Sequence, residues 1–481
     1  SQRCAMDASL HDLADIAVDS ALRLGADYAD ARVRSDWGHR VTLRNGSPDP
    51  PASFSSMGIG VRVLVGRSMA FGSTNRLDAR SVEELVGSLA RIAGSASRIG
   101  GVEGLSREDP SIATWRAAES RRLEDVDPRE LLEGAKSMDS AATSAGAEIV
   151  GRWISMHLSV EEKYLRTSDG SRITSRVPRV FAFALLTARD GSRVMQRTVE
   201  IGGSGGWELV SGMDFPGRIS RESKDLVEVL RKAEPEDLSD VKSVIVGPEI
   251  SGIMAHESVG HPFEADRILG REAAQAGGSY VGRDGLGTRV GGPEAFVSDD
   301  PTIPGSYGYY EYDEEGVPAR RKRLMVAGTV NELLHDRETA RVFGIHSNGS
   351  ARSSEYSREP IPRMSNTFVE PGDRTLEELM EEAGRALLLE SYMEWNIDDK
   401  RENQRYVGLK AHLVEGGRPV KLVLNPVLEV TSQRLWSSVV ARGKVVEFSP
   451  GTCGKGEPMQ GVPVWFGGPH MLIKGVSLGR R

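Results

Sequence analysis

The sequence predicts an α+β fold, with an N-terminal α/β region that contains an antiparallel sheet and a C-terminal β-rich region that carries one histidine-bearing helix. Residues 149–201 alternate polar and apolar side chains with period two, and Ser168-Asp169-Gly170 and Arg189-Asp190-Gly191 mark turns between the strands. From Tyr406 onward, most segments between turns have strand composition. Helical patterns precede and follow runs of strands, which indicates α+β layers.

The chain is long enough for two or more domains, because it has 481 residues. The polar run Ala233 to Asp240 is the candidate boundary, which predicts regions 1–238 and 239–481. A Gly/Ser-rich stretch at 94–104 predicts a possible boundary within the first region.

Composition narrows the function class. The chain has 61 basic and 69 acidic residues, so its net charge of −8 gives no reason to expect nucleic-acid binding. No apolar run approaches the ~20 residues of a membrane span, and the first residues lack a signal pattern, so we expect a cytoplasmic protein that binds no membrane. Cys4 and Cys453 are too few for a disulfide framework, which leaves Cys453 as a free thiol.

Apolar periodicity predicts the N-terminal elements in order. Leu10, Leu13, Ala17, Ala21 and Leu24 recur at helical spacing and predict the first helix. Further elements follow from the same patterns: strands over 28–34, 39–44, 57–65 and 67–71, a helix beginning near Ser81, a helix capped by Asp127 and Pro128, the strands of 149–201, and a helix over 218–232.

In the C-terminal region, the strand Val241–Val246 leads directly into a helix predicted from Glu249 to Val259. The stretch from Gly277 to Tyr312 reads as a long Gly- and Tyr-rich loop, which is typical of a lid, a binding loop or a subunit contact. Thr375 and Glu378 predict a capped helix that continues to about Leu389. Later strands are expected at 324–330, 409–414, 420–430, 444–448 and 470–476.

The segment His256-Glu257-Ser258-Val259-Gly260-His261 places two imidazoles and one carboxylate within six residues. Neutral imidazole is a good zinc ligand, and a catalytic zinc takes three protein ligands and keeps one position for water. A glutamate directly after the first histidine can act as general base on that water. The alternative is a buried helix end whose histidines pack as ordinary side chains.

The spacing of these histidines is unusual. Metalloproteases of the common helical pattern have two residues between the glutamate and the second histidine, whereas three intervene here. An ideal α-helix would set the rings roughly 140° apart. Either a π-type bulge or a helix end at Gly260 would bring them together, and Pro262 favours the helix end, with His261 just beyond it.

A third ligand and an outer shell are also predicted. Cys453 lies in the glycine-flanked stretch 451–456, read as a loop, where a thiolate can reach a metal; the alternative is a small buried hydrophobe. Glu264 or Asp266 can accept the second ring N–H of a bound histidine, or else belong to a solvated acidic turn. Arg363 and Asn366 follow two prolines and are candidates to bind a peptide main chain or terminal carboxylate, or to form a structural turn.

Four segments of the C-terminal half resemble the TldD/PmbA family, which includes proteins once called modulators of DNA gyrase. They are His256–His261, which matches the family's HExxxH; Glu264-Ala265-Asp266; Pro362-Arg363-Met364-Ser365-Asn366-Thr367; and the tail from Gly451-Thr452-Cys453-Gly454 through Gln460, Pro463 and Gly467-Gly468-Pro469. The residues that follow His261 are most like those of archaeal-type members, whereas the N-terminal half resembles the family in element order only.

The resemblance implies a metallopeptidase whose zinc is held at the positions of His256, His261 and Cys453, with Glu257 as catalytic acid/base. It implies a homodimer, or a heterodimer with a TldE/PmbA-like chain, that encloses the active sites in a cavity and takes short or unfolded peptides. TldE-type partners lack the metal motif, so this chain resembles the active kind. Nothing in the sequence supports the gyrase label.

Two other functions remain open on the sequence alone. A non-catalytic peptide-binding or regulatory subunit would close a structural metal site with a fourth protein ligand, for which His346, His412 and His470 are candidates. A zinc-dependent amidohydrolase acting on small molecules is the weaker alternative.

Overall fold

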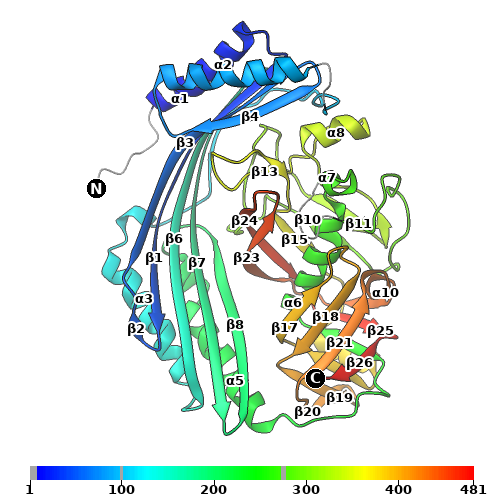
Figure 1. The fold of residues 1–481 in the computed structure, drawn as a ribbon. Helices are drawn as coiled ribbons and strands as arrows, with labels where there is room; N and C mark the ends of the chain where they lie inside the picture. The colour runs from blue at the N-terminus through cyan, green and yellow to red at the C-terminus, as the bar shows by residue number, and fades with distance from the viewer. Residues whose placement is uncertain (1–7, 98–100, 272–277) are drawn as a thin grey trace.

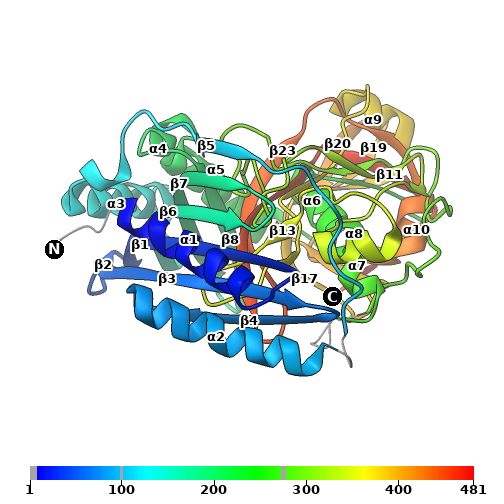
Figure 2. The same cartoon turned by 90° about the horizontal axis from the view of Figure 1, so that it is seen from above.

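The α+β fold is confirmed in the computed structural model, which describes residues 8–97, 101–271 and 278–481. Cys4, Gly277 and part of the 94–104 stretch lie outside these ranges. Figures 1 and 2 show one long curved sheet, coloured blue to green, on one side of the molecule and the C-terminal region, coloured green to red, on the other. We refer to residues 1–238 and 239–481 as the N-terminal and C-terminal regions; a domain boundary between them stays a prediction.

Eight strands form the N-terminal sheet, in the order β4-β3-β1-β6-β7-β5, with β2 paired to β1 and β8 paired to β7. The segment predicted as two strands near residues 28–44 is one strand of 17 residues. The predicted antiparallel strands of 149–201 are β6, β7 and β8. The strands are β1 (Tyr28–Arg44), β2 (Ser47–Pro48), β3 (Ala52–Val65), β4 (Ser68–Thr74), β5 (Ile112–Arg116), β6 (Ile149–Thr167), β7 (Arg172–Asp190) and β8 (Arg193–Ser204).

Helices cover the apolar face of this sheet. One cluster joins α1 and α2 to β1 and β3, through residues such as Ala31, Val33 and Val61. A second cluster joins α3 and α5 to the other end of the long strands, through residues such as Ile154 and Val180. Side chains of one parity share a face of a strand, so the same strands present their other side chains to the C-terminal region. The helices are α1 (Ala8–Arg23), α2 (Ala79–Ala96), α3 (Pro128–Thr143), α4 (Leu209–Gly212) and α5 (Phe215–Lys232).

The opposite face of the sheet is charged and meets the C-terminal region through buried ion pairs. Arg62 on β3 lies 2.9 Å from Glu315 and also pairs with Asp30, and all three side chains are at most 3% exposed. Arg32 and Lys163 both pair with Glu314, at 3.1 and 2.6 Å. Buried charges need such partners, because an unpaired ion loses its hydration without compensation.

The C-terminal region is built from three larger sheets and one short pair. Their orders are β12-β11-β10-β15-β24-β23, β20-β19-β16-β9-β25-β22, β17-β18-β21-β26 and β13-β14. The strands are β9 (Ser243–Val246), β10 (Val297–Asp299), β11 (Lys322–Val326), β12 (Thr329–Val330), β13 (Ala351–Arg352), β14 (Ile361–Pro362), β15 (Asn366–Val369), β16 (Ala386–Leu389), β17 (Tyr392–Ile397), β18 (Asn403–Gly408), β19 (Ala411–Glu415), β20 (Arg418–Leu422), β21 (Pro426–Thr431), β22 (Val439–Arg442), β23 (Glu447–Lys455), β24 (Gln460–Gly468), β25 (Met471–Lys474) and β26 (Ser477–Arg480).

The helix predicted from Thr375 to about Leu389 is wrong in its second half. The helix capped by Thr375 is α9 (Leu376–Ala383), and it ends there because Gly384 adopts a positive φ of 68°. The apolar run after it, predicted as helix, is strand β16, which pairs with β9 and β19. The remaining helices are α6 (Pro248–Ala255), α7 (Ala265–Ile268), α8 (Arg337–Phe343) and α10 (Ser432–Ser437). Within the described ranges, no helix combines the length and the apolar character needed to cross a membrane.

Replacing Arg62 by Met should destabilise the protein strongly, because the change leaves Asp30 and Glu315 as buried, uncompensated carboxylates. We expect the free energy of unfolding to fall by about 3–5 kcal/mol in a urea titration. A variant that also carries Asp30→Asn and Glu315→Gln should recover part of the loss. The matched control is Arg80→Ala, whose exposed pair with Glu84 should not contribute measurably; equal effects of R62M and R80A would contradict the prediction.

Candidate metal centre

The helix that carries the histidines follows directly from a central strand. β9 leads through Gly247 into α6, and α6 packs against β24 at a close approach of two glycines. A Cβ atom on Gly252 would lie 2.5 Å from the backbone nitrogen of Gly467, so a larger residue would push the helix off the strand. Because β23 pairs with β24, the close approach brings Cys453 within reach of the helix.

The sequence predicted that the helix ends at Val259, but it continues beyond this residue. It continues as one π-helical turn, His256–Gly260, and then as the 3-10 turn His261–Phe263. The N–H of His261 donates to the carbonyl of His256, an i→i+5 bond that places the two residues one turn apart. Pro262 fits at the start of the new turn, where a missing N–H costs nothing.

Side chains from distant segments hold the π-turn. The hydroxyl of Ser258 donates to the carbonyl of Met254 at 2.5 Å and accepts from the indole N–H of Trp436 at 2.9 Å. The hydroxyl of Tyr280 donates to the carbonyl of Ser258 at 2.5 Å. Trp436 is fully buried, so these bonds lie in the core of the region.

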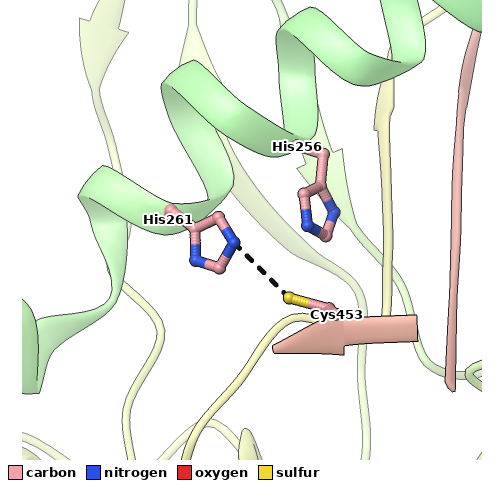
Figure 3. A group of neighbouring side chains, drawn as sticks. All are labelled: His256, His261 and Cys453. Carbon is pink, nitrogen blue, oxygen red and sulfur yellow. Dashed lines mark hydrogen bonds between the residues drawn. The ribbon is translucent and has the colours of Figure 1, made fainter. Parts of the chain in front are cut away.

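His256, His261 and Cys453 come together at this turn. Figure 3 shows both imidazoles on the same side of the helix, pointing towards the sulfur on β23. Their ligand atoms all lie within 4.8 Å of one another, and Nε2 of His261 lies 3.4 Å from Sγ of Cys453. All three side chains are buried. Cys453 lies within strand β23, paired with Val462, and not in the predicted loop.

The thiol and the imidazole shift each other's pKa. Burial works to raise the pKa of Cys453, but the charges of His261 and His256 outweigh it and hold that pKa well below its usual value. Burial works to lower the pKa of His261, but Cys453 and Glu264 raise it above its usual value. The pair therefore favours a thiolate, which is the form that binds metals.

An outer layer of charges orients His261. Oε1 of Glu264 lies 2.6 Å from Nδ1 of His261, so this carboxylate accepts the ring N–H and directs Nε2 towards the sulfur. Glu264 is also 3.3 Å from Lys455, which in turn lies 2.7 Å from Asp266. Against the effect of burial, Lys455, His261 and Arg267 lower the pKa of Glu264 well below its usual range. Of the two predicted carboxylates, Glu264 contacts the imidazole and Asp266 anchors Lys455.

The donor set fits a zinc ion. Two imidazoles and a thiolate are ligands that zinc prefers, and similar Cys/His sites keep a position open for water. Nδ1 of His256 is buried and has no hydrogen-bond partner among the described residues. A buried nitrogen in that state costs free energy unless a bound ion or water satisfies it. His256, His261 and Cys453 would hold the metal.

A cavity of about 330 Å³ opens beside the three ligands. Glu257 lines it and forms an ion pair with Arg401, each side chain being 12% exposed. Sequence reasoning missed five other lining residues, because nothing in their local pattern distinguishes them: Glu200 on β8, Tyr392 and Trp395 on β17, Arg401, and Phe466 on β24.

Arg363 and Asn366 lie elsewhere and are fully buried. The guanidinium of Arg363 donates to the carbonyls of Cys453 and Gln460, so it fixes the β23–β24 hairpin that carries the thiol. The amide of Asn366 donates to the carbonyl of Asp300 at 2.7 Å and accepts from the N–H of Trp465 at 3.1 Å. Both side chains are occupied by protein groups, and their predicted contact with substrate stays a prediction.

The three candidates for a fourth ligand do not join the cluster. Within the described parts of the chain, the group contains His256, His261 and Cys453 alone. His346 is exposed near Glu108, His412 lies 3.5 Å from Glu390, and His470 lines a different cavity. The described residues thus leave a coordination position open towards the cavity.

Three convergent ligands, an open side and an adjoining carboxylate define the class of metal-dependent hydrolases. The chain belongs to the PmbA/TldD metallopeptidase family. The family's PmbA/TldA metallopeptidase C-terminal domain matches residues 239–480, its domain 1 matches 29–93 and its central domain matches 121–233. The chain is therefore a metalloprotease homologue with a candidate His-His-Cys metal site.

Relatives match over nearly the whole chain. A metalloprotease of Methanocaldococcus jannaschii is 29% identical over 452 residues, which cover 94% of this chain and 96% of that protein. A protein named zinc metalloprotease TldD homolog, of Saccharolobus solfataricus, is 24% identical and covers 96% and 98% of the two chains. The crystal structure of TldE from Thermococcus kodakarensis is 16% identical, with a TM-score of 0.77 and coverage of 98% and 100%, and shows the same fold.

Glu264→Gln should weaken zinc binding about 10- to 100-fold, because the variant loses the carboxylate that orients His261. Competition with a chromogenic chelator at fixed pH measures the affinity, and circular dichroism checks that the variant folds. Glu257→Gln is the matched control, since Glu257 belongs to the cavity and not to the ligand group, and should bind zinc as the unaltered chain does. Equal affinity of E264Q and E257Q would show that the Glu264 contact does not support the metal.

Proposed function

We propose that the protein is a zinc-dependent peptidase that hydrolyses short or unfolded peptides. The observation that carries the proposal is the open side of the His256, His261 and Cys453 cluster, which faces a cavity that also holds Glu257. Zinc is the metal proposed, because the donor set suits it and the Saccharolobus relative carries zinc in its name.

Each residue has a distinct part. When bound, zinc supplies the positive charge that acidifies a water and polarises the peptide carbonyl. Glu257 accepts the proton of the attacking water and returns it to the nitrogen of the leaving amine. Glu264 keeps the Nδ1 proton on His261, so that Nε2 stays free to bind the metal. Arg401 holds the carboxylate of Glu257 at the cavity wall until substrate enters.

The size of the cavity supports a substrate without tertiary structure. A space of about 330 Å³ admits a few residues of extended chain and excludes a folded domain. The dimer that the family resemblance implies, with a second copy or with a TldE/PmbA-like chain, stays a prediction and would enclose this space further.

The alternative, a non-catalytic subunit with a structural metal, is less well supported. A structural zinc site has four protein ligands, and the described residues supply three. The alternative also gives no role to a glutamate placed beside the open position.

Replacing Glu257 by Gln should lower the rate of peptide hydrolysis by about 10²- to 10⁴-fold, because the variant cannot accept the proton of the attacking water. Zinc content, measured by elemental analysis, should stay that of the unaltered chain. A panel of short peptides, followed by mass spectrometry with and without a chelator, provides the measurement. Unchanged turnover in E257Q would remove Glu257 from the mechanism, and a zinc-loaded wild type that cleaves nothing in the panel would favour the non-catalytic alternative.

A further inference from the structure

The N-terminal region contributes one residue, Glu200, to the lining of the metal cavity. Glu200 on β8 lines this cavity together with Tyr392 and Trp395, which belong to the neighbouring strand β17. Glu200 has the parity of β8 that faces away from the helices, since Val199 and Ile201 belong to the apolar cluster under α5. Strand β8 of one region thus delivers a carboxylate to the site of the other.

Glu200 is largely shielded from water and has no cation of its own. Within residues 8–97, 101–271 and 278–481 its carboxyl group forms neither an ion pair nor a hydrogen bond. The cation whose charge lowers the pKa of Glu200 is Arg197, which already binds Glu222 at 2.9 Å and Glu249 at 2.5 Å. The other guanidinium of the cavity, that of Arg401, pairs with Glu257.

The surroundings of Glu200 favour the binding of a cationic group in the cavity. Burial and the charge of Glu249 raise the pKa of Glu200 to about 7, although Arg197 opposes them. A carboxylate in that environment gains most from a cation that enters the cavity. The aromatic side chains of Tyr392 and Trp395 line the same space, and aromatic faces attract ammonium groups. One face of the Tyr392 ring already carries the guanidinium of Arg197, at 5.3 Å from the ring centroid.

We propose that Glu200, with Tyr392 and Trp395, forms a subsite that binds an ammonium group of the peptide substrate. The inference rests on the proposed peptidase function, and it names the substrate class: peptides with a free α-amino group or a lysine side chain close to the cleaved bond. The shared chemistry is the alkylammonium ion, which donates to the carboxylate and lies against the rings. Glu200 is then a specificity-determining residue, separate from the metal ligands and from Glu257.

Peptide binding tests the subsite without requiring turnover. The zinc-loaded, full-length E257Q variant is titrated calorimetrically with one leucine-containing tetrapeptide amide in three forms: free α-amine, N-acetylated, and N-acetylated with one lysine in place of a neutral residue. We expect one of the two ammonium forms to bind about 10- to 100-fold more tightly than the neutral acetylated form. Preference for the first assigns the subsite to the peptide N-terminus, and preference for the third assigns it to a lysine side chain.

Adding Glu200→Gln to E257Q should bring the three dissociation constants together, by weakening the ammonium forms and leaving the neutral form unchanged. Glu394→Gln is the matched control, because Glu394 lies on β17 beside Trp395 but pairs with Arg405 outside the cavity; it should keep the preference. Equal binding of all three peptides to E257Q, or a preference that survives E200Q, overturns the proposal.

Hydrolysis by the wild type distinguishes a failure of the ammonium subsite from a failure of the proposed peptidase function. If peptides bind with the ammonium preference but are not cleaved, the peptidase proposal fails and the subsite stands. If the neutral acetylated peptide is cleaved as fast as the ammonium forms, the subsite fails and the peptidase proposal stands. A kcat that falls alike for all three peptides in the single variant E200Q, with KM unchanged, would place Glu200 in the chemistry and also overturn the assignment.

Discussion

The metal centre depends on one backbone hydrogen bond, from the N–H of His261 to the carbonyl of His256. In a regular α-helix the two rings would diverge by roughly 140°, and no single ion could bind both. The π-turn makes the five-residue spacing equal to one turn, but it leaves irregular backbone that needs support. Ser258, Tyr280 and Trp436 supply that support with hydrogen bonds. A local departure from α-helical geometry is therefore maintained by Ser258 within the turn and by Tyr280 and Trp436 from other segments, which is typical of functional sites.

Charged and polar groups of opposite character alternate through the site, and this pairing offsets the cost of burying them. The thiolate of Cys453, the imidazole of His261, the carboxylate of Glu264 and the ammonium of Lys455 follow one another in space, each beside an opposite or polarisable partner. Cys453 and Lys455 are two residues apart on β23, so their side chains share a face of the strand. One strand thus delivers both a candidate metal ligand and the cation that stabilises the carboxylate behind His261. Removing one member would take a partner from a buried charged or polar group, which costs more than the loss of an exposed ion pair.

The residues of the candidate metal site were easier to predict from the sequence than the backbone conformation that brings them together. His256, His261 and Cys453 could be named because few residue types bind zinc, and the strands of residues 149–201 because period two is unambiguous over that length. The π-turn could not be predicted, because Pro262 favours a helix end when only its sequence neighbours are considered. The tertiary hydrogen bonds that stabilise the π-turn come from distant residues, which a local sequence pattern does not reveal. The strand at Ala386–Leu389 was mistaken for helix because a short apolar run fits both, and pairing with β9 decides between them.

Glu200 shows why part of a site escapes sequence reasoning: on an alternating strand, a glutamate reads as a solvent-facing residue until a second region covers that face. Here ion pairs hold the C-terminal region against that face of the sheet. Arg197 binds Glu222 of α5 and Glu249 of α6, so a single guanidinium ties a helix of the N-terminal region to the helix that leads into the candidate metal ligands. With Arg197 satisfied by two carboxylates, Glu200 is left without a partner in the cavity. An ion-pair network that helps to join the two regions therefore also leaves the Glu200 carboxyl unpaired, and the N-terminal sheet contributes a side chain to the site as well as supporting it.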